Sequence, residues 1–153
     1  KVTYNLKEVR ENIGYVPQHI YLSDDTIANN ITLGEKNPDI DLLMSAINKA
    51  ELAEFVNSKK DKLNTIVGEK GTLLSGGEIQ RIGIARALYR NPKVLFFDEA
   101  TSSLDVNTEE KIINTLSKIN NLTKIFITHR TWKMSFFDKI FVVENSEVIL
   151  KKN

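Results

Sequence analysis

The sequence lacks a phosphate-binding loop of the Gly-x-x-x-x-Gly-Lys-Ser/Thr type. Of its seven glycines, only Gly71 and Gly76 have the required spacing, and Gly77 and Glu78 follow where Lys and Ser or Thr would stand. A glutamate at that point would repel the β- and γ-phosphates of a nucleotide. The chain also begins at Lys1 without an initiator methionine, from which we expect a piece of a longer protein.

Three further absences limit the class of protein. There is no cysteine, which fits a cytoplasmic protein and excludes a disulfide framework. No apolar stretch approaches the roughly 18 residues that a membrane-spanning helix needs. The net charge is +1 and no Lys/Arg block dominates, so we expect no nucleic-acid partner. The 153 residues are enough for one domain with a substantial core.

Hydrophobic patterns predict alternating strands and helices. Buried strands are expected at Ile13–Val16, Val94–Phe97 and Ile125–Ile127, the second covered on both faces because it is continuously apolar. Helical spacing indicates two helices between Asp39 and Ser58, broken near Lys49–Glu51, one from Ser75 to Asn91, and one capped by Asp105 or Asn107. Residues 18–38 and 61–72 read as loops, and residues 140–150 as a terminal hairpin. This order predicts an α/β core with a parallel sheet.

The segment Leu74-Ser75-Gly76-Gly77-Glu78 begins one of these helices. Ser75 is a good N-cap, and Glu78 three residues later completes a capping box. The free N–H groups and the positive dipole end of a helix suit an anion, and glycine lets a phosphate approach them closely. The alternative is a capped helix whose glycines serve only tight packing.

Two carboxylates follow the second predicted strand. Asp98 ends that strand at the carboxyl edge of the sheet, where ligands bind in such folds. Mg²⁺ prefers oxygen ligands and keeps several waters, so Asp98 could hold it through a water. Glu99 is placed to orient or deprotonate an attacking water. An acidic pair that merely caps a helix is the alternative.

Other polar side chains leave strands at the same edge. His129 follows the Ile125–Ile127 strand and is expected to contact a γ-phosphate, although it could simply cap the strand. Gln18 follows Pro17, and its amide could reach a metal or a water, or neither. His19 has no such setting and is expected to be a solvated loop residue.

These motifs together resemble those of the ATP-binding-cassette (ABC) nucleotide-binding domain, over nearly the whole chain. Gln18 is similar to the Q-loop glutamine, Leu74–Glu78 to the signature motif, and Val94–Asp98 to the Walker B strand. Glu99 resembles the catalytic glutamate, Ser102–Asp105 the D-loop and His129 the switch histidine.

The resemblance implies an α/β fold: a partial P-loop NTPase-like parallel sheet flanked by helices, with an inserted α-helical signature subdomain. The chain would be the C-terminal two-thirds of the domain. Residues 20–90 would form the helical subdomain, and residues 1–19 and 91–153 the remnant of the ATPase core. Its ligands would be ATP and Mg²⁺. Catalytic roles fall to Glu99 and His129, nucleotide contacts to Ser75, Gly76, Gly77, Glu78, Gln18 and Asp105, and metal contacts to Asp98 and Gln18.

Two segments narrow the resemblance to exporters and flippases. Thr26–Ile31 and Thr65–Gly71 are similar to the segments that follow the Q-loop and precede the signature in exporter-type transporters. This implies a domain at the cytoplasmic face of a membrane. Its partners would be a transmembrane domain and a second nucleotide-binding domain, identical or different. The alternative is a soluble cassette ATPase of DNA-repair, chromosome or ribosome-associated type.

The missing loop has two further consequences under this resemblance. The parent protein would hydrolyse ATP, whereas this chain alone would bind ATP weakly and hydrolyse it poorly. The loop's strand would lie between the strand that ends near Thr128 and the strand at residues 140–143. Without it both edges are open, so we expect association or domain swapping.

Overall fold

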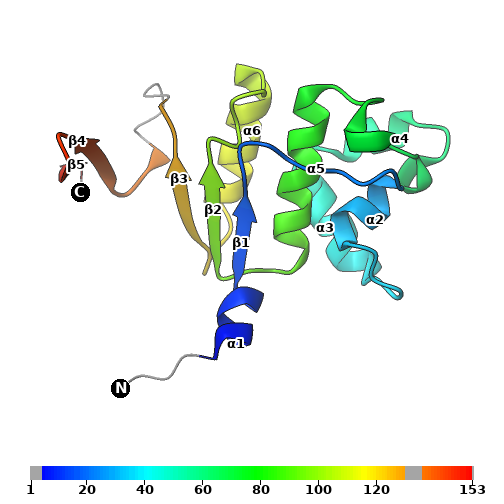
Figure 1. Ribbon diagram of the computed structural model, residues 1–153, viewed down its shortest axis with the longest axis horizontal. Helices are drawn as coiled ribbons and strands as arrows, with labels where there is room; N and C mark the ends of the chain where they lie inside the picture. The colour runs from blue at the N-terminus through cyan, green and yellow to red at the C-terminus, as the bar shows by residue number, and fades with distance from the viewer. Residues whose placement is uncertain (1–4, 130–135, 153) are drawn as a thin grey trace.

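A three-stranded parallel sheet forms the centre of the protein. The computed structural model describes residues 5–129 and 136–152. Strands β1 (Ile13–Val16), β2 (Val94–Asp98) and β3 (Thr123–Ile127) lie in the order β1-β2-β3, all parallel. Their carboxyl ends therefore meet at one edge, as Figure 1 shows. The predicted α/β fold with a parallel sheet is confirmed.

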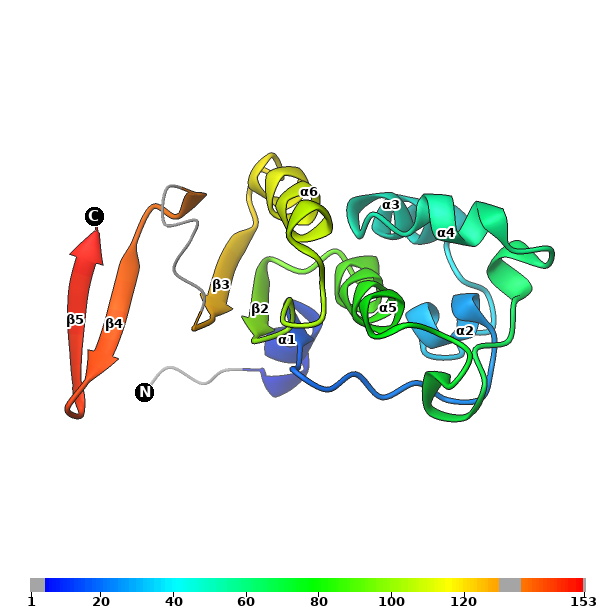
Figure 2. The same cartoon turned by 90° about the horizontal axis from the view of Figure 1, so that it is seen from above.

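Two connections link the strands. The short one between β2 and β3 contains α6 (Val106–Ser117). The long one between β1 and β2 contains α2 (Ile27–Thr32), α3 (Ile40–Lys49), α4 (Ala53–Ser58), the 3₁₀ turns η1 (Lys62–Asn64) and η2 (Glu69–Gly71), and α5 (Gly76–Tyr89). Seen from above, α5 lies between the sheet and the three smaller helices (Figure 2). The break between α3 and α4 is confirmed at residues 50–52, and η1 and η2 lie in the predicted 61–72 loop.

One hydrophobic core runs from the helical part into the sheet. Its fully buried side chains include Ile27 and Ile47 from α2 and α3, Ile82 from α5, Leu95 from β2 and Ile112 from α6. Helix α5 contributes to both sides of this core, because residues along its length are buried among the small helices and against β1. The start of α5 is thereby held in a fixed relation to the sheet.

The prediction that residues 18–38 form a loop is wrong for α2. Thr26 caps this helix through a hydrogen bond from the backbone N–H of Asn29 (3.1 Å). Ile27 and Ile31 are both buried in the core. The turn-forming asparagines concealed the helix, since six residues are too few to show a helical period and tertiary packing stabilises them.

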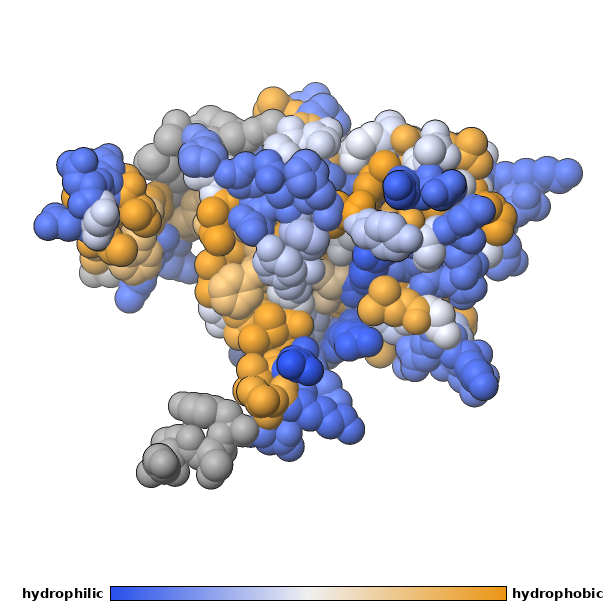
Figure 3. All heavy atoms as spheres, in the orientation of Figure 1, coloured by the Kyte–Doolittle hydropathy of each residue, from blue (hydrophilic) through white to orange (hydrophobic). Residues whose placement is uncertain are grey.

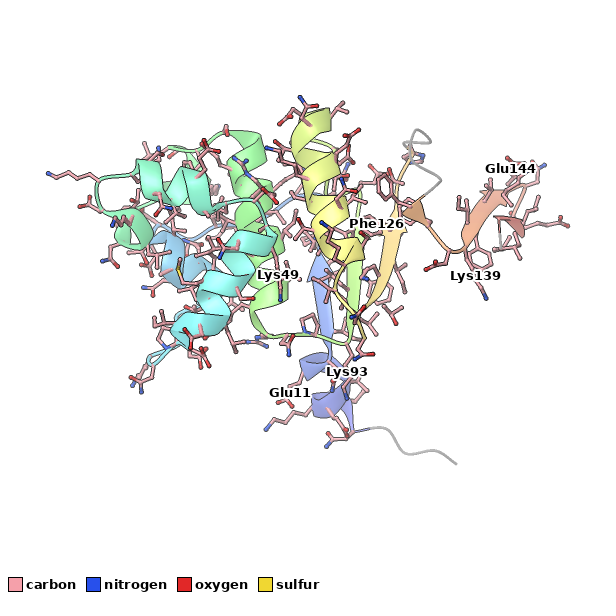
Figure 4. The ribbon with its side chains drawn as sticks, turned by 180° about the vertical axis from the view of Figure 1, so that it is seen from behind. Glu11, Lys49, Lys93, Phe126, Lys139 and Glu144 are labelled. Atoms are coloured by element: carbon pink, nitrogen blue, oxygen red, sulfur yellow. The ribbon has the colours of Figure 1, made fainter. Side chains whose placement is uncertain are left out.

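The strands are less buried than their composition predicts. Residues alternate along β1 and β2, with Leu95 and Phe97 fully buried and their neighbours only partly so. Along β3, Ile127 is 53% exposed although a buried strand was expected. On the helical side, Phe97 and Phe126 stack with ring centroids 4.4 Å apart, and Phe126 lies beside α6 (Figure 4). Among the residues described, only the helix-covered face of the sheet is fully packed.

Two further elements flank the sheet. Helix α1 (Leu6–Glu11), which we did not predict, precedes β1 and is capped by Asn5. Strands β4 (Ile140–Glu144) and β5 (Glu147–Lys152) form the predicted hairpin, and its turn residues Asn145 and Ser146 both have positive φ, as tight hairpin turns require. Within the described residues, no strand bonds to the outer edge of β3, and the hairpin stands apart from it (Figures 1 and 2). Figure 3 shows apolar atoms over the front of the sheet and on the hairpin.

Candidate active site at the carboxyl edge of the sheet

Glu99 is the centre of a polar cluster at the carboxyl edge of the sheet. Its Oε2 accepts a hydrogen bond from the side-chain amide of Gln18 (3.0 Å), and its Oε1 lies 2.8 Å from Nε2 of His129. These three residues follow β1, β2 and β3, so the parallel register brings the ends of all three strands together. The expected convergence of Gln18, Glu99 and His129 is found.

The backbone at Glu99 is held in an unusual conformation. Its φ of 50° lies in the left-handed region, which costs a residue other than glycine on the order of 1 kcal/mol. Its N–H donates to the carbonyl of Ile127 (2.9 Å), and its own carbonyl accepts from the N–H of Ser102 (3.1 Å). These bonds hold the turn that aims the Glu99 carboxylate between its two neighbours. Strain of this kind is concentrated at functional sites.

Asp98 has a different partner. Its Oδ2 accepts a hydrogen bond from the phenol of Tyr15 on β1 (2.8 Å). This bond, which stabilises the protonated phenol beside a carboxylate, raises the pKa of Tyr15 above its ordinary value. Tyr15 was missed in the sequence. Its position on the same face of the sheet as Asp98 follows only from the strand register, in which Tyr15 lies opposite Phe96.

The start of α5 has the predicted capping box. Oγ of Ser75 accepts from the N–H of Glu78 (3.3 Å), and a carboxylate oxygen of Glu78 accepts from the N–H of Ser75 (2.7 Å). The N–H groups of Gly76 and Gly77 have no acceptor within the described part of the chain. This helix of 14 residues therefore presents two free donors at its positive end.

The two glycines at this point are not required by packing. A Cβ at Gly76 or Gly77 would approach no described atom closer than 3.4 Å, which is ordinary van der Waals contact. By contrast, a Cβ at Gly14 would lie 2.9 Å from the carbonyl oxygen of Ala87. Glycine inside a helix costs about 1 kcal/mol relative to alanine. Close approach of a ligand explains Gly76 and Gly77 better than tight packing does.

The loop between β2 and α6 connects the sheet edge to the start of α5. Ser103 lies against Gly76 and Gly77, and its N–H donates to Oε1 of the buried Gln80 on α5 (3.1 Å). Gln80 was also missed, because its spacing reads as one more position on a helix. Asp105 caps α6 through the N–H of Thr108 (3.0 Å), so it, and not Asn107, is the N-cap. Hydrogen bonds from Thr108 lower the pKa of Asp105.

The two segments expected to identify an exporter lie side by side. Thr26 and Ile66 form an antiparallel bridge, and the N–H of Ile27 donates to the carbonyl of Thr65 (2.9 Å). Arg86 of α5 connects to this region through the carbonyl of Asn30 (2.7 Å) and the carbonyl of Tyr21 (3.0 Å). Burial lowers the pKa of Arg86.

His19 is exposed, as expected of a solvated loop residue.

The donor set fits a magnesium ion that is shared with phosphates. The described residues contain no cluster of three or more His, Cys, Asp or Glu side chains that could form a protein cage. Mg²⁺ does not need one, since it is commonly held by one or two carboxylates with waters and substrate phosphates. Asp98 keeps Oδ1 for that role, because the only hydrogen bond to its side chain within the described residues is to Oδ2. Gln18 is directed toward Glu99, so its metal contact stays a prediction.

The chain is similar to known proteins along most of its length. A family model described as ABC transporter matches residues 1–102. The chain is 44% identical over 148 residues to the ATP-dependent lipid A-core flippase of Wigglesworthia glossinidia brevipalpis, covering 95% of this chain and 26% of that protein. It is 40% identical over 147 residues to the mitochondrial iron-sulfur clusters transporter ATM1 of Kluyveromyces lactis, covering 94% and 20%.

A solved structure gives the same result. A bacterial Atm1-family ABC exporter with ATP bound superposes with a TM-score of 0.84 at 38% identity, covering 92% of this chain and 25% of that one. The chain thus spans about a fifth to a quarter of the length of these relatives. No helix in the described parts of the chain is long and apolar enough to cross a membrane. With a family model matching two-thirds of its length, the chain belongs to the ABC transporter family.

Proposed function

We propose that this chain is part of the ATPase domain of an ABC exporter or flippase, and that the intact protein couples ATP hydrolysis to transport across a membrane. The main observation behind this proposal is that Gln18 and His129 both contact the carboxylate of Glu99, which follows Asp98 directly. The similar proteins named above are a transporter, a flippase and an exporter, which favours a transporter over a soluble cassette ATPase.

Glu99 acts as the general base in this proposal. Each carboxylate oxygen has two lone pairs, so Glu99 can still accept a proton from water while Gln18 and His129 orient it. The resulting hydroxide forms a bond to the γ-phosphorus, and the bond from that phosphorus to the bridging oxygen of ADP breaks. Asp98 would hold Mg²⁺, which neutralises phosphate charge when bound.

The two glycines of α5 are proposed to serve the ATP of a second nucleotide-binding domain. Within the described residues, no hydrogen bond joins the cap at Ser75 and Glu78 to Asp98 or Glu99. The free N–H groups of Gly76 and Gly77 then face a phosphate held by the partner, while Ser75 contributes its hydroxyl. Asp105, at the end of the same loop, is proposed to contact nucleotide across this interface.

A pair of mixed dimers tests this arrangement in the intact transporter. Glu99→Gln disables the site of its own subunit, whereas Gly77→Asp places a negative charge against the phosphates of the partner's site. With both changes in one subunit, both sites fail, so single-turnover hydrolysis is lost. With one change in each subunit, one site remains intact and hydrolysis persists. The reverse pattern would show that α5 serves its own subunit's ATP.

We propose a docking place for the transmembrane partner in a hollow between the segment after Gln18 and the second half of α5. Its rim carries the exposed side chains of Tyr21 and Leu33. Arg86 lies in the hollow and bonds to the carbonyl of Tyr21, so force applied there reaches both α5 and the segment that holds Gln18. This surface would face the membrane, with the chain at its cytoplasmic side.

A variant that loses transport but keeps ATP hydrolysis would test the role of this surface. Tyr21→Ala in the intact protein should lower transport several-fold while ATP hydrolysis persists, because the substitution removes contact area and leaves the Glu99 cluster intact. Ile40→Ala, which also removes an exposed apolar side chain but outside the hollow, is the matched control. Transport that falls equally in both variants would contradict the assignment.

The chain alone is proposed to bind ATP weakly, since its sequence contains no Gly-x-x-x-x-Gly-Lys-Ser/Thr loop to hold the phosphates. A Mg-ATP titration by calorimetry checks this. Binding in the micromolar range would contradict it.

A further inference from the structure

Tyr15 contacts one of the two carboxylates at the edge of the sheet. Its phenol donates to Oδ2 of Asp98 at 2.8 Å, across the β1–β2 pair. The neighbours of Tyr15 on β1, Gly14 and Val16, are buried on the helical face, so alternation puts Tyr15 on the open face with Asp98. The side chain is 55% exposed, so the core does not explain why tyrosine stands here.

We propose that Tyr15 is a positioning residue for Asp98, holding Oδ2 so that Oδ1 is directed toward Mg²⁺ or a water bound to it. This rests on the proposed function, in which Asp98 holds the metal. Carboxylates that bind metals are commonly fixed by hydrogen bonds of their own, and removing such a partner lowers metal affinity by about 10–100-fold. A hydrogen bond to an ionised oxygen is also stronger than one between neutral groups.

The geometry distinguishes this role from simple packing. A phenylalanine at position 15 would keep the ring on the sheet and lose only the hydroxyl, so the strand pairing of β1 with β2 would be unchanged. The Asp98 carboxylate would then be free to rotate, because within the described residues Tyr15 is its one hydrogen-bond donor. The expected loss therefore falls on metal binding and not on nucleotide binding.

The chain provides a matched control. The phenol of Tyr89 on α5 donates to a carboxylate oxygen of Glu35, also at 2.8 Å, away from the sheet edge. Tyr89→Phe removes the same donor at the same distance from the same kind of acceptor, and it also removes the hydroxyl that accepts from the N–H of Asp39 (3.0 Å). It should leave metal binding unchanged, so any general effect of losing a tyrosine hydroxyl can be subtracted.

The experiment measures Mn²⁺ binding to the intact transporter with a non-hydrolysable ATP analogue, by the paramagnetic resonance signal of free Mn²⁺. Tyr15→Phe should bind Mn²⁺ about tenfold more weakly, with unchanged affinity for the analogue in EDTA, and Tyr89→Phe should match the wild type. Tyr15→Phe that binds Mn²⁺ as tightly as the wild type, or more tightly, overturns the inference. Asp98→Asn is measured alongside: wild-type binding there would overturn the proposed metal role itself.

Discussion

The carboxyl edge of the sheet and the start of α5 are both polar, but they are built differently. At the sheet edge, side chains contact one another: Gln18 and His129 hold Glu99, and Tyr15 holds Asp98. At the start of α5, Ser75 and Glu78 cap only their own helix, and the backbone N–H groups of Gly76 and Gly77 have no acceptor among the described residues.

This difference suggests a division of labour. A cluster whose members fix each other is prepared for chemistry, because orientation is already determined before a ligand arrives. A helix start with free backbone donors is prepared for binding, since the ligand must complete it. The first region should therefore be sensitive to exchange of a single atom, and the second to added volume or charge.

The largest effect is expected from an isosteric change at the sheet edge. Glu99→Gln removes the proposed base and keeps its shape, so hydrolysis by the intact protein should fall by about 10²–10⁴-fold. Binding of a non-hydrolysable ATP analogue should be unchanged. Single-turnover hydrolysis measures the first quantity and equilibrium titration the second.

The control for this prediction is Glu54→Gln, which makes the same exchange at an exposed position of α4. It should leave hydrolysis at the wild-type rate. If Glu99→Gln retains most of the hydrolytic activity, the sheet edge is not the catalytic region. The proposed difference between the sheet edge and the start of α5 would then be wrong.

A pair of glycine substitutions should give opposite results. Gly14→Ala places a Cβ 2.7 Å from Leu95 and 2.9 Å from a backbone carbonyl that cannot move aside, which should destabilise the fold by about 1–3 kcal/mol. Gly77→Ala meets no such obstacle and should stabilise α5 by up to about 1 kcal/mol. In the intact protein, however, its methyl group should impede hydrolysis.

Urea unfolding of the chain, followed by circular dichroism, measures the two changes in the free energy of unfolding. If Gly77→Ala is as destabilising as Gly14→Ala, the proposed difference between the start of α5 and the packed position of Gly14 is wrong. Packing would then explain Gly77 as it explains Gly14, and a ligand would not be needed to account for glycine at that position.

The sequence predicts the polar residues of the site better than it predicts which segments are buried. Strand ends were found from apolar runs closed by Pro17 or Asp98, and the capping box from Ser75 and Glu78, because these signals are local. Helix α2 could not be found this way: its six residues contain two adjacent asparagines, and only packing of Ile27 and Ile31 in the core reveals it.

Contacts between distant residues were the other limit. The bond from Tyr15 to Asp98 joins residues 83 positions apart, and that from the N–H of Ser103 to Gln80 joins residues 23 apart. Neither is implied by spacing, since each depends on strand register or on how a loop packs against a helix. The half-open face of the sheet was likewise hidden, because an apolar run such as residues 125–127 looks the same whether one face or both are covered.

That open region should affect association, a smaller effect than loss of the base or of the fold. We expect the chain alone to form dimers or larger species, because β3 has an unpaired outer edge within the described residues and Ile127 is 53% exposed. Ile127→Lys should shift the mass measured by light scattering toward the 17.4 kDa of one chain. Ile40→Lys, at a similarly exposed position of α3, should not. A wild-type chain that is monomeric at every concentration would contradict this.

The smallest effect is expected at the start of α6, which Asp105 caps with a charged oxygen, whereas Ser75 caps α5 with a neutral one. Hydrogen bonds from Thr108 lower the pKa of Asp105 in the folded state. The ionised carboxylate therefore stabilises the fold at pH values above the ordinary aspartate pKa of about 4, and this contribution is lost as the pH falls through the lower pKa of the folded state.

Asp105→Asn separates the cap from its charge, since asparagine is an equally good N-cap that does not titrate in this range. The difference in free energy of unfolding between wild type and Asp105→Asn should be constant from about pH 5 to 7 and should decline below about pH 4. Comparing the two proteins cancels the titration of the other carboxylates. A difference that stays constant to about pH 2.5 would mean that the cap at Asp105 does not depend on its charge.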